Sequence, residues 1–499
     1  MIDKLFYKLM YDKRLKRTLS MFEVLYKASG EVSVKHLEEQ LNISRKTVIS
    51  TLNYGKTLLP DTITLVVSED SALLYSESSE PIDVAIIEIA KTTTSFRILK
   101  HAFYDEDLKI HELADEVFLS ESSLRIRISH MNTILSSYDI RLTYYDVKLV
   151  GDEANIRLFY YTYFSEFQEL FNSVLEEGFD YCTSIYNDIL KMTLENGTKL
   201  LNYSYLHITR WLFVTINRME VGKIIELNNN FVEQMKKRNS YKEFNKIYIR
   251  GLSQHLTDII IPESEIVWAY IIRMNPIVYE RRQDRELQHD ENDFMRLRKK
   301  IDWLISDIMF SLEIIESDRN DFLEIHRAYL LNLSLLIEIS PLFQRGSPTV
   351  IIYVKENLVG LFDAWCDSLS SNNDEQFAKI TDVFSVATQL AMISSQFISK
   401  DKRKAKRVLF SFEGEATFAA YLADIGKSLL PSGVEGVFIF NEPVTQNLYK
   451  RNMPDIIVCN YKIAELTEET KVLRMSLIPE QKEWKLLKEL LIDLDFNYF

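Results

Sequence analysis

The stretch from Tyr104 to Gly151 contains two runs of apolar residues at helical spacing, followed by two short runs in which apolar and polar residues alternate. The helical runs are Ile110, Leu113, Ala114 and Val117, then Leu124, Ile128, Met131 and Leu135. A tight connection, Phe118-Leu119-Ser120, separates them, and the Ser120 hydroxyl suits the N-cap of the second helix. Ile140 and Leu142 then alternate against Val147 and Leu149 across a Tyr-Asp turn. The pattern predicts a helix-turn-helix followed by a two-stranded wing.

The same pattern occurs earlier, at residues 32–75, displaced by 76 positions without a gap. The matched pairs are Val34 with Ile110, Leu37 with Leu113, Leu41 with Val117, Ile43 with Leu119, Ser44 with Ser120, Thr47 with Ser123, Val48 with Leu124 and Leu52 with Ile128. Turn and cap coincide as well as the apolar positions, so the repeat is more specific than shared helicity. Ile63, Leu65 and Val67 then alternate before a turn, as in a second wing. We predict two winged helix-turn-helix domains, at residues 1–78 and 79–175.

The second helix of each unit carries basic and small polar residues on the side opposite its predicted core. Such a helix fits the major groove, where these side chains reach phosphates and base edges. The candidate DNA-binding residues are Arg45, Lys46, Ile49, Ser50 and Asn53 in the first unit, and Ser122, Ser123, Arg125, Ile126, Arg127 and Ser129 in the second. We expect the second unit to be the principal reader of DNA. Small three-helix units also serve as protein–protein modules, and this alternative stays open.

Residues 176–402 show long amphipathic helical patterns with few glycines or prolines. A polar stretch near residues 284–293 divides them into two predicted helical bundles, at 176–290 and 291–402. His207 and His326 each begin a predicted helix whose Leu and Ile positions run inward. An aromatic helix at residues 156–171 is expected to pack the DNA-binding half on the first bundle.

Strand and helix patterns alternate after a charged linker at Lys400–Arg407. The predicted strands are 408–412, 437–440, 456–459 and 472–475, and the predicted helices are 416–430 and 480–494. Strands joined by helical crossovers indicate a small parallel α/β domain, at residues 403–499. The predicted fold class is therefore mainly α and multidomain, with a small C-terminal α/β domain.

Charge modifies this picture. The 499-residue chain has a net charge of −14, yet residues 1–60 carry 11 Lys and Arg against 6 Asp and Glu. A basic end on an acidic body is expected when only one part of a protein meets phosphate. Cys182, Cys366 and Cys459 lie far apart and suit reduced thiols in a cytoplasmic protein. We find no run of about 18 apolar residues and no signal-peptide core, so we expect no membrane span.

The order of these parts resembles the Mga/AtxA family of regulators in Gram-positive bacteria. The segment around His207, with LTDIIIPESEIVWAYIIRM at residues 256–274, resembles a phosphotransferase-system (PTS) regulation domain. The resemblance implies phosphorylation of His207 and His326 by PTS proteins such as HPr or EIIB. His255 is a weaker candidate. Ile272 and Arg273 stand where the family places another histidine after its Pro-x-x-Glu element. Alternatively, both main histidines are hydrogen-bonded helix residues without phosphate chemistry.

The C-terminal domain is similar to the EIIB domain of sugar phosphotransferases. Those domains carry a phosphocysteine after the first strand, where this chain has Ser411-Phe412-Glu413-Gly414-Glu415, and Cys459 lies in a different loop. The resemblance therefore implies a non-catalytic dimerisation surface, giving a homodimer or a higher oligomer.

We interpret the chain as a DNA-binding transcriptional regulator, an activator of virulence or carbohydrate-responsive genes, with PTS-dependent control. It is not expected to be an enzyme, and neither a cofactor nor a metal is expected. The alternative is a PTS-controlled antiterminator that binds RNA. Those antiterminators carry a small β-rich RNA-binding module, which the tandem helix-turn-helix pattern does not match.

Overall fold

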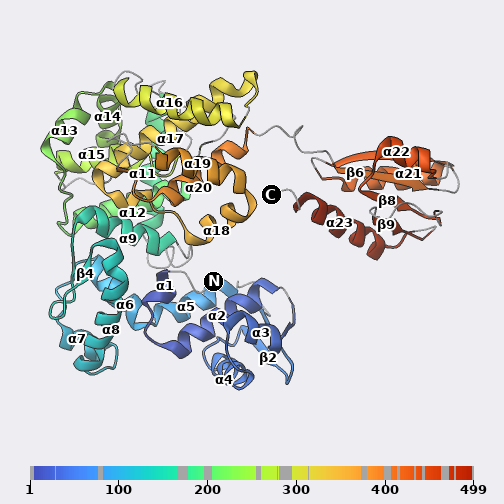
Figure 1. The fold of residues 1–499 in the computed structure, drawn as a ribbon. Coiled ribbons are helices and arrows are strands. Elements are labelled where there is room, and N and C mark those ends of the chain that lie inside the picture. Colours follow the sequence, from blue (N-terminus) through green and yellow to red (C-terminus); the bar gives the residue numbers. More distant parts are fainter. Residues whose placement is uncertain are drawn as a thin grey trace. The chain divides into compact units, whose positions relative to one another are not determined.

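The structure is a computed structural model, and helices dominate it (Figure 1). It describes residues 5–28, 30–76, 82–165, 178–195, 205–253, 255, 260–277, 279, 295–312, 314–371, 379–397, 406–412, 416–431, 434–440, 444–461, 463, 471–476 and 479–496. The chain divides into two compact bodies. One comprises Met1–Ile305, Leu323–Thr349 and Leu369–Val386, and the other comprises Ser306–Phe322, Val350–Ser368 and Ala387–Phe499. The predicted bundle boundary at 284–293 and most of the predicted linker lie outside the described residues. The five-domain division therefore stays a prediction.

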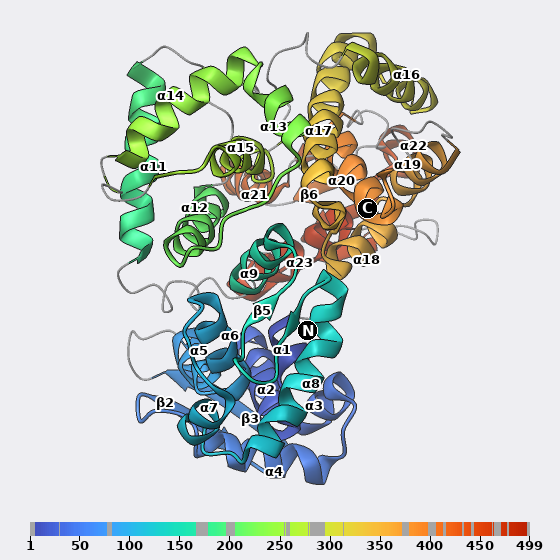
Figure 2. The same ribbon diagram turned by 90° about the vertical axis from the view of Figure 1, so that its left-hand side faces the viewer.

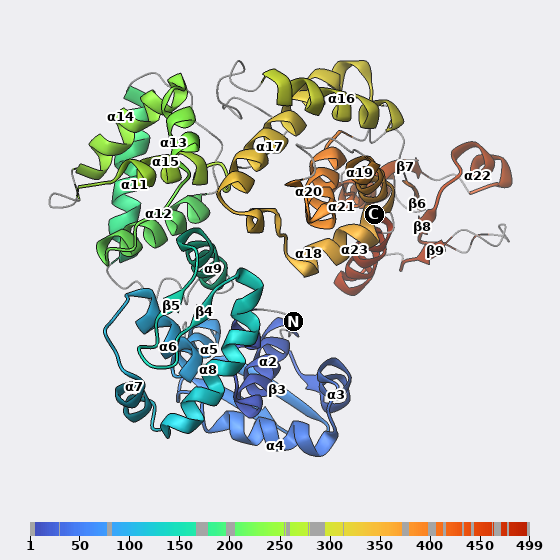
Figure 3. The same cartoon turned by 60° about the vertical axis from the view of Figure 1, so that its left-hand side comes forward.

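The N-terminal part folds around α2 (Lys13–Ala28), which follows the short α1 (Leu5–Leu9). The helices α3 (Val34–Leu41) and α4 (Arg45–Lys56) form the first helix-turn-helix. The strands β2 (Ile63–Val67) and β3 (Ser71–Ser76) form the predicted wing, and β1 (Val32–Ser33) adds a third antiparallel strand, in the order β1-β3-β2. Both α4 and β3 contact α2, as Figure 3 shows.

The second unit contains α5 (Ile82–Lys91), α6 (Thr94–Phe103), α7 (Ile110–Glu116) and α8 (Glu121–Leu135). After the 3-10 turn η1 (Ser136–Tyr138), the strands β4 (Arg141–Leu142) and β5 (Leu149–Val150) pair antiparallel. Leu142 lies opposite Leu149, which confirms the predicted wing although each strand has only two residues. The N-terminal α1 contacts α8, and the Lys8 carbonyl is 2.9 Å from Nε2 of His130.

The aromatic helix is α9 (Glu153–Ser165), which runs between the second unit and α12 in Figure 2. The helices that follow are α11 (Gly178–Glu195), α12 (Tyr205–Glu220), α13 (Asn229–Lys236), α14 (Asn239–Ser253) and α15 (Glu263–Ile272). Next come α16 (Met295–Ser311), η2 (Glu316–Asp318), α17 (Arg319–Ile339), η3 (Pro341–Gln344), α18 (Pro348–Asn357), α19 (Val359–Ser371) and α20 (Val383–Ser395). In the described part of the chain, no helix combines the length and apolar character that a bilayer span requires.

The C-terminal part is a four-stranded parallel sheet, as predicted, and Figure 1 labels three of its strands, β6, β8 and β9. The strand order is β7-β6-β8-β9. Its strands are β6 (Lys406–Phe412), β7 (Val434–Phe440), β8 (Ile456–Cys459) and β9 (Lys471–Arg474). Its helices are α21 (Ala416–Leu429), α22 (Gln446–Asn452) and α23 (Gln481–Phe496). Alternate residues of β6 point to opposite faces, so Val408 and Phe410 pack with α21 and α23, whereas Leu409 packs toward α22.

Candidate functional site

The first recognition helix, α4, rests on α2 through its buried side. Val48 and Leu52 are buried as predicted. Gly55 lies so close to α2 that a Cβ atom there would be 2.9 Å from the Phe22 ring. At the start of α3, Ser33 caps the helix by accepting a hydrogen bond from the His36 amide at 3.1 Å. These contacts fix which side of α4 remains open.

Four of the five predicted residues on α4 are exposed to solvent. Lys46, Ser50 and Asn53 are exposed, and Ile49 is half-buried. Arg45 is exposed too, but its guanidinium donates to Oδ1 of Asp70 at 2.8 Å. Since Asp70 lies in the turn between β2 and β3, the wing tip neutralises the first cation of the recognition helix.

The second recognition helix, α8, buries the four residues predicted to face the core, namely Leu124, Ile128, Met131 and Leu135. Ser120 is its N-cap, because its hydroxyl accepts from the Ser123 amide at 3.2 Å. Asn132 holds the wing against the helix. Its side chain donates to the Leu142 carbonyl at 3.0 Å and accepts from the Leu142 amide at 2.7 Å. This pair of hydrogen bonds could not be predicted from the sequence, since no local pattern connects the two residues.

The structure divides the six predicted residues of α8 into two groups. The exposed group is Ser122, Arg125, Ile126 and Ser129. Ser123 instead is half-buried and accepts a hydrogen bond of 2.9 Å from the Ser120 hydroxyl, which also lies 3.0 Å from the hydroxyl of Ser122. Arg127 donates to the Thr94 hydroxyl at 3.2 Å and stands 5.5 Å from the ring of Tyr11. The open face is therefore narrower than the predicted set. Its cation is Arg125, which lies 3.8 Å from the exposed Glu121 carboxylate.

A buried network of charges connects the second unit to the helices that follow. The Arg157 guanidinium on α9 grips the Glu265 carboxylate with two hydrogen bonds of 2.8 and 2.7 Å. Both side chains are at most 1% exposed. Glu265 also accepts from the Ile225 amide at 2.7 Å, and Arg157 donates to the Lys223 carbonyl at 2.9 Å. Glu265 is the glutamate of the Pro-x-x-Glu element, and its partner could not be predicted from the sequence.

Arg218 on α12 extends this network to the second unit. It donates twice to the Glu153 carboxylate, at 2.8 Å each, and once to the Phe103 carbonyl at the end of α6, also at 2.8 Å. Arg218 is buried, and Phe103 stacks on Phe213 with 5.6 Å between ring centroids. The predicted packing role of the aromatic helix is thus confirmed, and buried ion pairs reinforce it.

The two predicted phosphorylation sites occupy different environments. His207 is the third residue of α12 and is half-buried, and its Nδ1 contacts the hydroxyl of Tyr161, which stacks on Trp211 at 4.1 Å. Burial, with a smaller contribution from Arg210, lowers the pKa of His207. The imidazole is therefore neutral near pH 7.

His326 does not begin its helix, so that prediction is wrong. It lies a full seven residues after Arg319, the first residue of α17, and it is 0% exposed. The cause is upstream, since Phe322 and Ile325 are buried and extend the apolar side of the helix toward the N-terminus. Any reagent can reach this imidazole only after α17 moves.

The structure also locates the remaining residues that the sequence singled out near the predicted phosphorylation sites and in the C-terminal domain. Where the family has a second histidine, Arg273 stacks on the rings of Phe244 and Tyr270 at 4.4 and 4.6 Å. His255 lies with its Nε2 2.8 Å from Oδ2 of Asp188. Cys459 is buried at the end of β8, and burial raises its thiol pKa. The described part of the expected EIIB loop, Ser411 and Phe412, is the buried end of β6, and residues 413–415 lie outside the described range.

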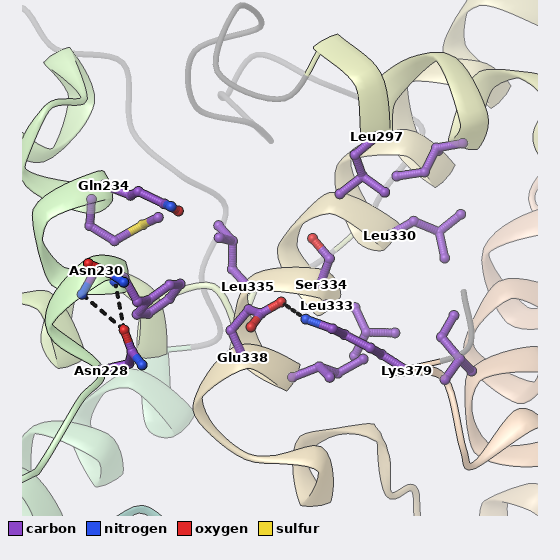
Figure 4. Close-up of a pocket in the computed structure, with 15 residues that line it drawn as sticks. Asn228, Asn230, Gln234, Leu297, Leu330, Leu333, Ser334, Leu335, Glu338 and Lys379 are labelled. Atoms are coloured by element: carbon purple, nitrogen blue, oxygen red, sulfur yellow. Dashed lines mark hydrogen bonds and ion pairs between the residues drawn. The ribbon is translucent and has the colours of Figure 1, made fainter. Parts of the chain in front are cut away.

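A cavity of about 650 Å³ opens between α13, α16 and α17 (Figure 4). Its wall combines Leu and Ile side chains with the amides of Asn230 and Gln234 and with an ion pair between Glu338 and Lys379. Neither His207 nor His326 is among its lining residues. Elsewhere, the described residues hold no group of three or more His, Cys, Asp or Glu side chains arranged for a metal ion.

Comparison with known proteins agrees with the helix-turn-helix geometry. Residues 83–164 match the Mga helix-turn-helix domain, a range that contains α6, α7, α8, the second wing and most of α9. The chain is 17% identical over 428 residues to the capsule synthesis positive regulator AcpB of Bacillus anthracis, covering 83% of this chain and 86% of AcpB. It is 23% identical over 150 residues to the positive regulator AcpA of the same organism, covering 30% and 31%.

A third relative is a protein of Streptococcus pneumoniae serotype 4 (strain ATCC BAA-334 / TIGR4) with the provisional name of trans-acting regulator. The two are 24% identical over 223 residues, which is 44% of this chain and 44% of the relative. The match thus spans less than half of that protein. Together with the matched domain, these relatives confirm the resemblance that the order of motifs indicates.

Proposed function

We propose that this chain, a regulator of the Mga/AtxA family, binds duplex DNA through α4 and α8 and activates transcription. The observation that carries the proposal is the pair of helix-turn-helix units, each with a buried core side, an open polar side and an adjoining wing. Positive regulation is proposed because AcpA and AcpB are named positive regulators. The second unit is the principal reader, since it lies in the matched range.

The charges of the two open faces assign them different roles. Arg125 is exposed on α8, and its pair with Glu121 at 3.8 Å is looser than the 2.8 Å pair of Arg45 with Asp70. Ser122 and Ser129 beside it can reach base edges or phosphates. On α4, Lys46 is exposed and Arg45 is bound by the wing. We therefore assign base reading to α8 and backbone contact to α4. Two units in one chain, doubled in a dimer formed through the C-terminal domain, add avidity.

Phosphorylation of His207 is the proposed control. With Nδ1 engaged by Tyr161, and no partner for Nε2 among the residues that the structure describes, Nε2 is the proposed acceptor. A phosphoryl group there adds about −1.5 to −2 charges. Tyr161 lies on α9, the helix that also carries Arg157 and Glu153. His207 therefore contacts α9, the same helix that carries two members of the buried charge network reaching the end of α6. His326, being buried, is the less accessible target.

The test compares three proteins on DNA selected from a random duplex pool by the full chain. Fluorescence anisotropy should show an affinity that falls steeply with salt, as phosphate contacts require. Arg125→Ala should weaken binding to the selected duplex by about 10-fold or more, the order expected for a lost base contact. Arg127→Ala serves as the matched control, because its guanidinium is directed to Thr94 and Tyr11.

Two outcomes would contradict the proposal. If no sequence is enriched from the pool, specific DNA binding is wrong. If a structured RNA competes as well as the selected duplex, the antiterminator interpretation gains instead. Equal losses in Arg125→Ala and Arg127→Ala would reject the assignment of α8's open side.

For the control by phosphorylation, a chain with His207→Ala should lose its response to HPr-dependent phosphotransfer, whereas His326→Ala should keep it.

A further inference from the structure

Phe118 combines two properties that rarely occur in one residue. Its side chain is 92% exposed, and its backbone adopts a left-handed conformation with φ of 54°. Bulky residues avoid this conformation because their Cβ atom crowds the following carbonyl oxygen. The residue therefore has an unfavourable backbone and an unfavourable exposure, and neither is relieved by packing within the domain.

The internal repeat shows what the fold requires at this position. In the second unit, the Leu119 amide donates to the Ala114 carbonyl at 2.8 Å and the Phe118 amide to the Asp115 carbonyl at 3.2 Å, which closes α7 with a Schellman motif. In the first unit, 76 residues earlier, the Ile43 amide donates to the Glu38 carbonyl at 3.2 Å.

The left-handed residue of that first turn is Asn42, with φ of 51°. Asparagine, like glycine, suits such a turn. The same turn is thus closed without an aromatic residue in the first copy. The fold accounts for the left-handed backbone at position 118, and it does not account for the phenylalanine.

The position of Phe118 indicates its use. It lies three residues before Glu121, the first residue of α8, so its side chain leaves the chain at the end of the recognition helix that approaches DNA first. A second apolar side chain, Ile126, is 55% exposed on the open side of the same helix. Apolar side chains in the major groove contact the C5-methyl group of thymine.

We propose that Phe118 is a specificity-determining residue of the second unit, where it contacts thymine methyl groups in the DNA site. The inference rests on the proposed DNA binding. It favours DNA over a protein partner because Phe118 is continuous in sequence with the helix whose exposed residues include Arg125 and Ile126. Thymine bases in the site are therefore read by apolar contact with their methyl groups, in addition to hydrogen bonds from α8.

The test uses Phe118→Asn, which introduces the residue that the chain itself places at the equivalent position 42. Each full-length protein is titrated against the duplex selected by the wild-type chain and against the same duplex with every thymine replaced by uracil, which lacks the methyl group. The wild type should bind the uracil duplex at least 3-fold more weakly. Phe118→Asn should bind the thymine duplex at least 3-fold more weakly than wild type and should show a smaller thymine-to-uracil ratio.

Thermal unfolding separates this role from a structural one. Phe118→Asn relieves the backbone, so its Tm should equal or exceed that of the wild type while its DNA affinity falls. A matched exchange, Asn42→Phe, should lower the Tm and leave the thymine-to-uracil ratio unchanged.

An unchanged thymine-to-uracil ratio in Phe118→Asn overturns the proposal, and so does a loss of affinity accompanied by a loss of Tm. Normal DNA binding with defective transcription in vitro also overturns it and indicates a protein partner for Phe118. Failure of the wild type to select any duplex would instead reject the proposed function itself.

Discussion

The bidentate pair between Arg157 and Glu265 offers the sharpest test of the energetics. Three donors converge on the Glu265 carboxylate: Nη2 of Arg157 and the Ile225 amide on Oε1, and Nη1 of Arg157 on Oε2. In Glu265→Gln, either orientation of the amide directs an N–H group at one of these donors. The substitution also removes one of the two carboxylates, Glu265 and Glu153, that compensate a guanidinium with 0% exposure.

We expect Glu265→Gln to lower the free energy of unfolding by about 3–5 kcal/mol, the cost of breaking a buried ion pair by removing one partner. Urea denaturation followed by circular dichroism measures it. The matched control is Glu39→Gln, which breaks a pair with Lys35 at 4.0 Å whose side chains are 82% and 63% exposed. Such surface pairs contribute about 0.2–1 kcal/mol.

A double-mutant cycle separates the interaction energy between Arg157 and Glu265 from the effects of the two single substitutions. Arg157→Met and Glu265→Leu should each be costly, and the double variant should cost less than their sum by about 0.5–3 kcal/mol, because no charge is then left buried without its partner. The reasoning would be refuted if Glu265→Gln cost no more than Glu39→Gln, or if the two single losses were additive.

Three further predictions concern the first wing, the packing of α4 on α2, and His207. Asp70→Asn should free Arg45 and strengthen DNA binding about 2–5-fold at low salt with a steeper salt slope, measured by anisotropy; an unchanged slope would contradict it. Gly55→Ala should destabilise the first unit by about 1–3 kcal/mol, because the new methyl group meets the Phe22 ring; a neutral effect on urea unfolding would show that α4 is not seated as described. The pKa of His207 is lowered on folding, so as the pH drops below the ordinary value of 6.5 the unfolded chain binds the proton first and the stability of the folded chain falls. Urea midpoints measured between pH 8 and 5 should therefore fall less in His207→Gln than in the wild type. Equal falls in the two proteins would contradict this prediction.

Periodicity was sufficient to predict the buried sides of the helix-turn-helix units. Leu124 and Ile128 repeat at the spacing of helical turns, and the structure buries both. The alternation of Ile140, Leu142 and their partners likewise predicted the short second wing. In these elements the local pattern determines which side meets the core, so one sequence carries the information.

Residues at the border of a helical face could not be assigned in this way. Arg127 adjoins buried Ile128, and its direction depends on Thr94 and Tyr11, which come from other parts of the chain. Arg45 faces solvent as predicted, but a carboxylate of the wing binds it. For long side chains, periodicity places the Cα atom, and tertiary partners decide where the charge lies.

The histidines show the same limit at the level of whole helices. The segments around His207 and His326 have similar apolar patterns, which predicted that each histidine begins a helix. The apolar residues upstream of His326 continue α17 toward its N-terminus, and His326 becomes an interior residue. A shared motif therefore did not imply a shared accessibility.

The Pro-x-x-Glu element shows how a family motif acquires a physical meaning. In the sequence it marked only a resemblance, since Glu265 has no partner within its own segment. In the structure its carboxylate holds Arg157 of α9, and the neighbouring Glu153 of α9 holds Arg218, whose guanidinium reaches the Phe103 carbonyl of the second helix-turn-helix unit. Buried charges that have little solvent to screen them therefore connect α15 to α6 through α9 and α12. The Pro-x-x-Glu element thus belongs to the contact that ties α15 to the helix-turn-helix half of the chain.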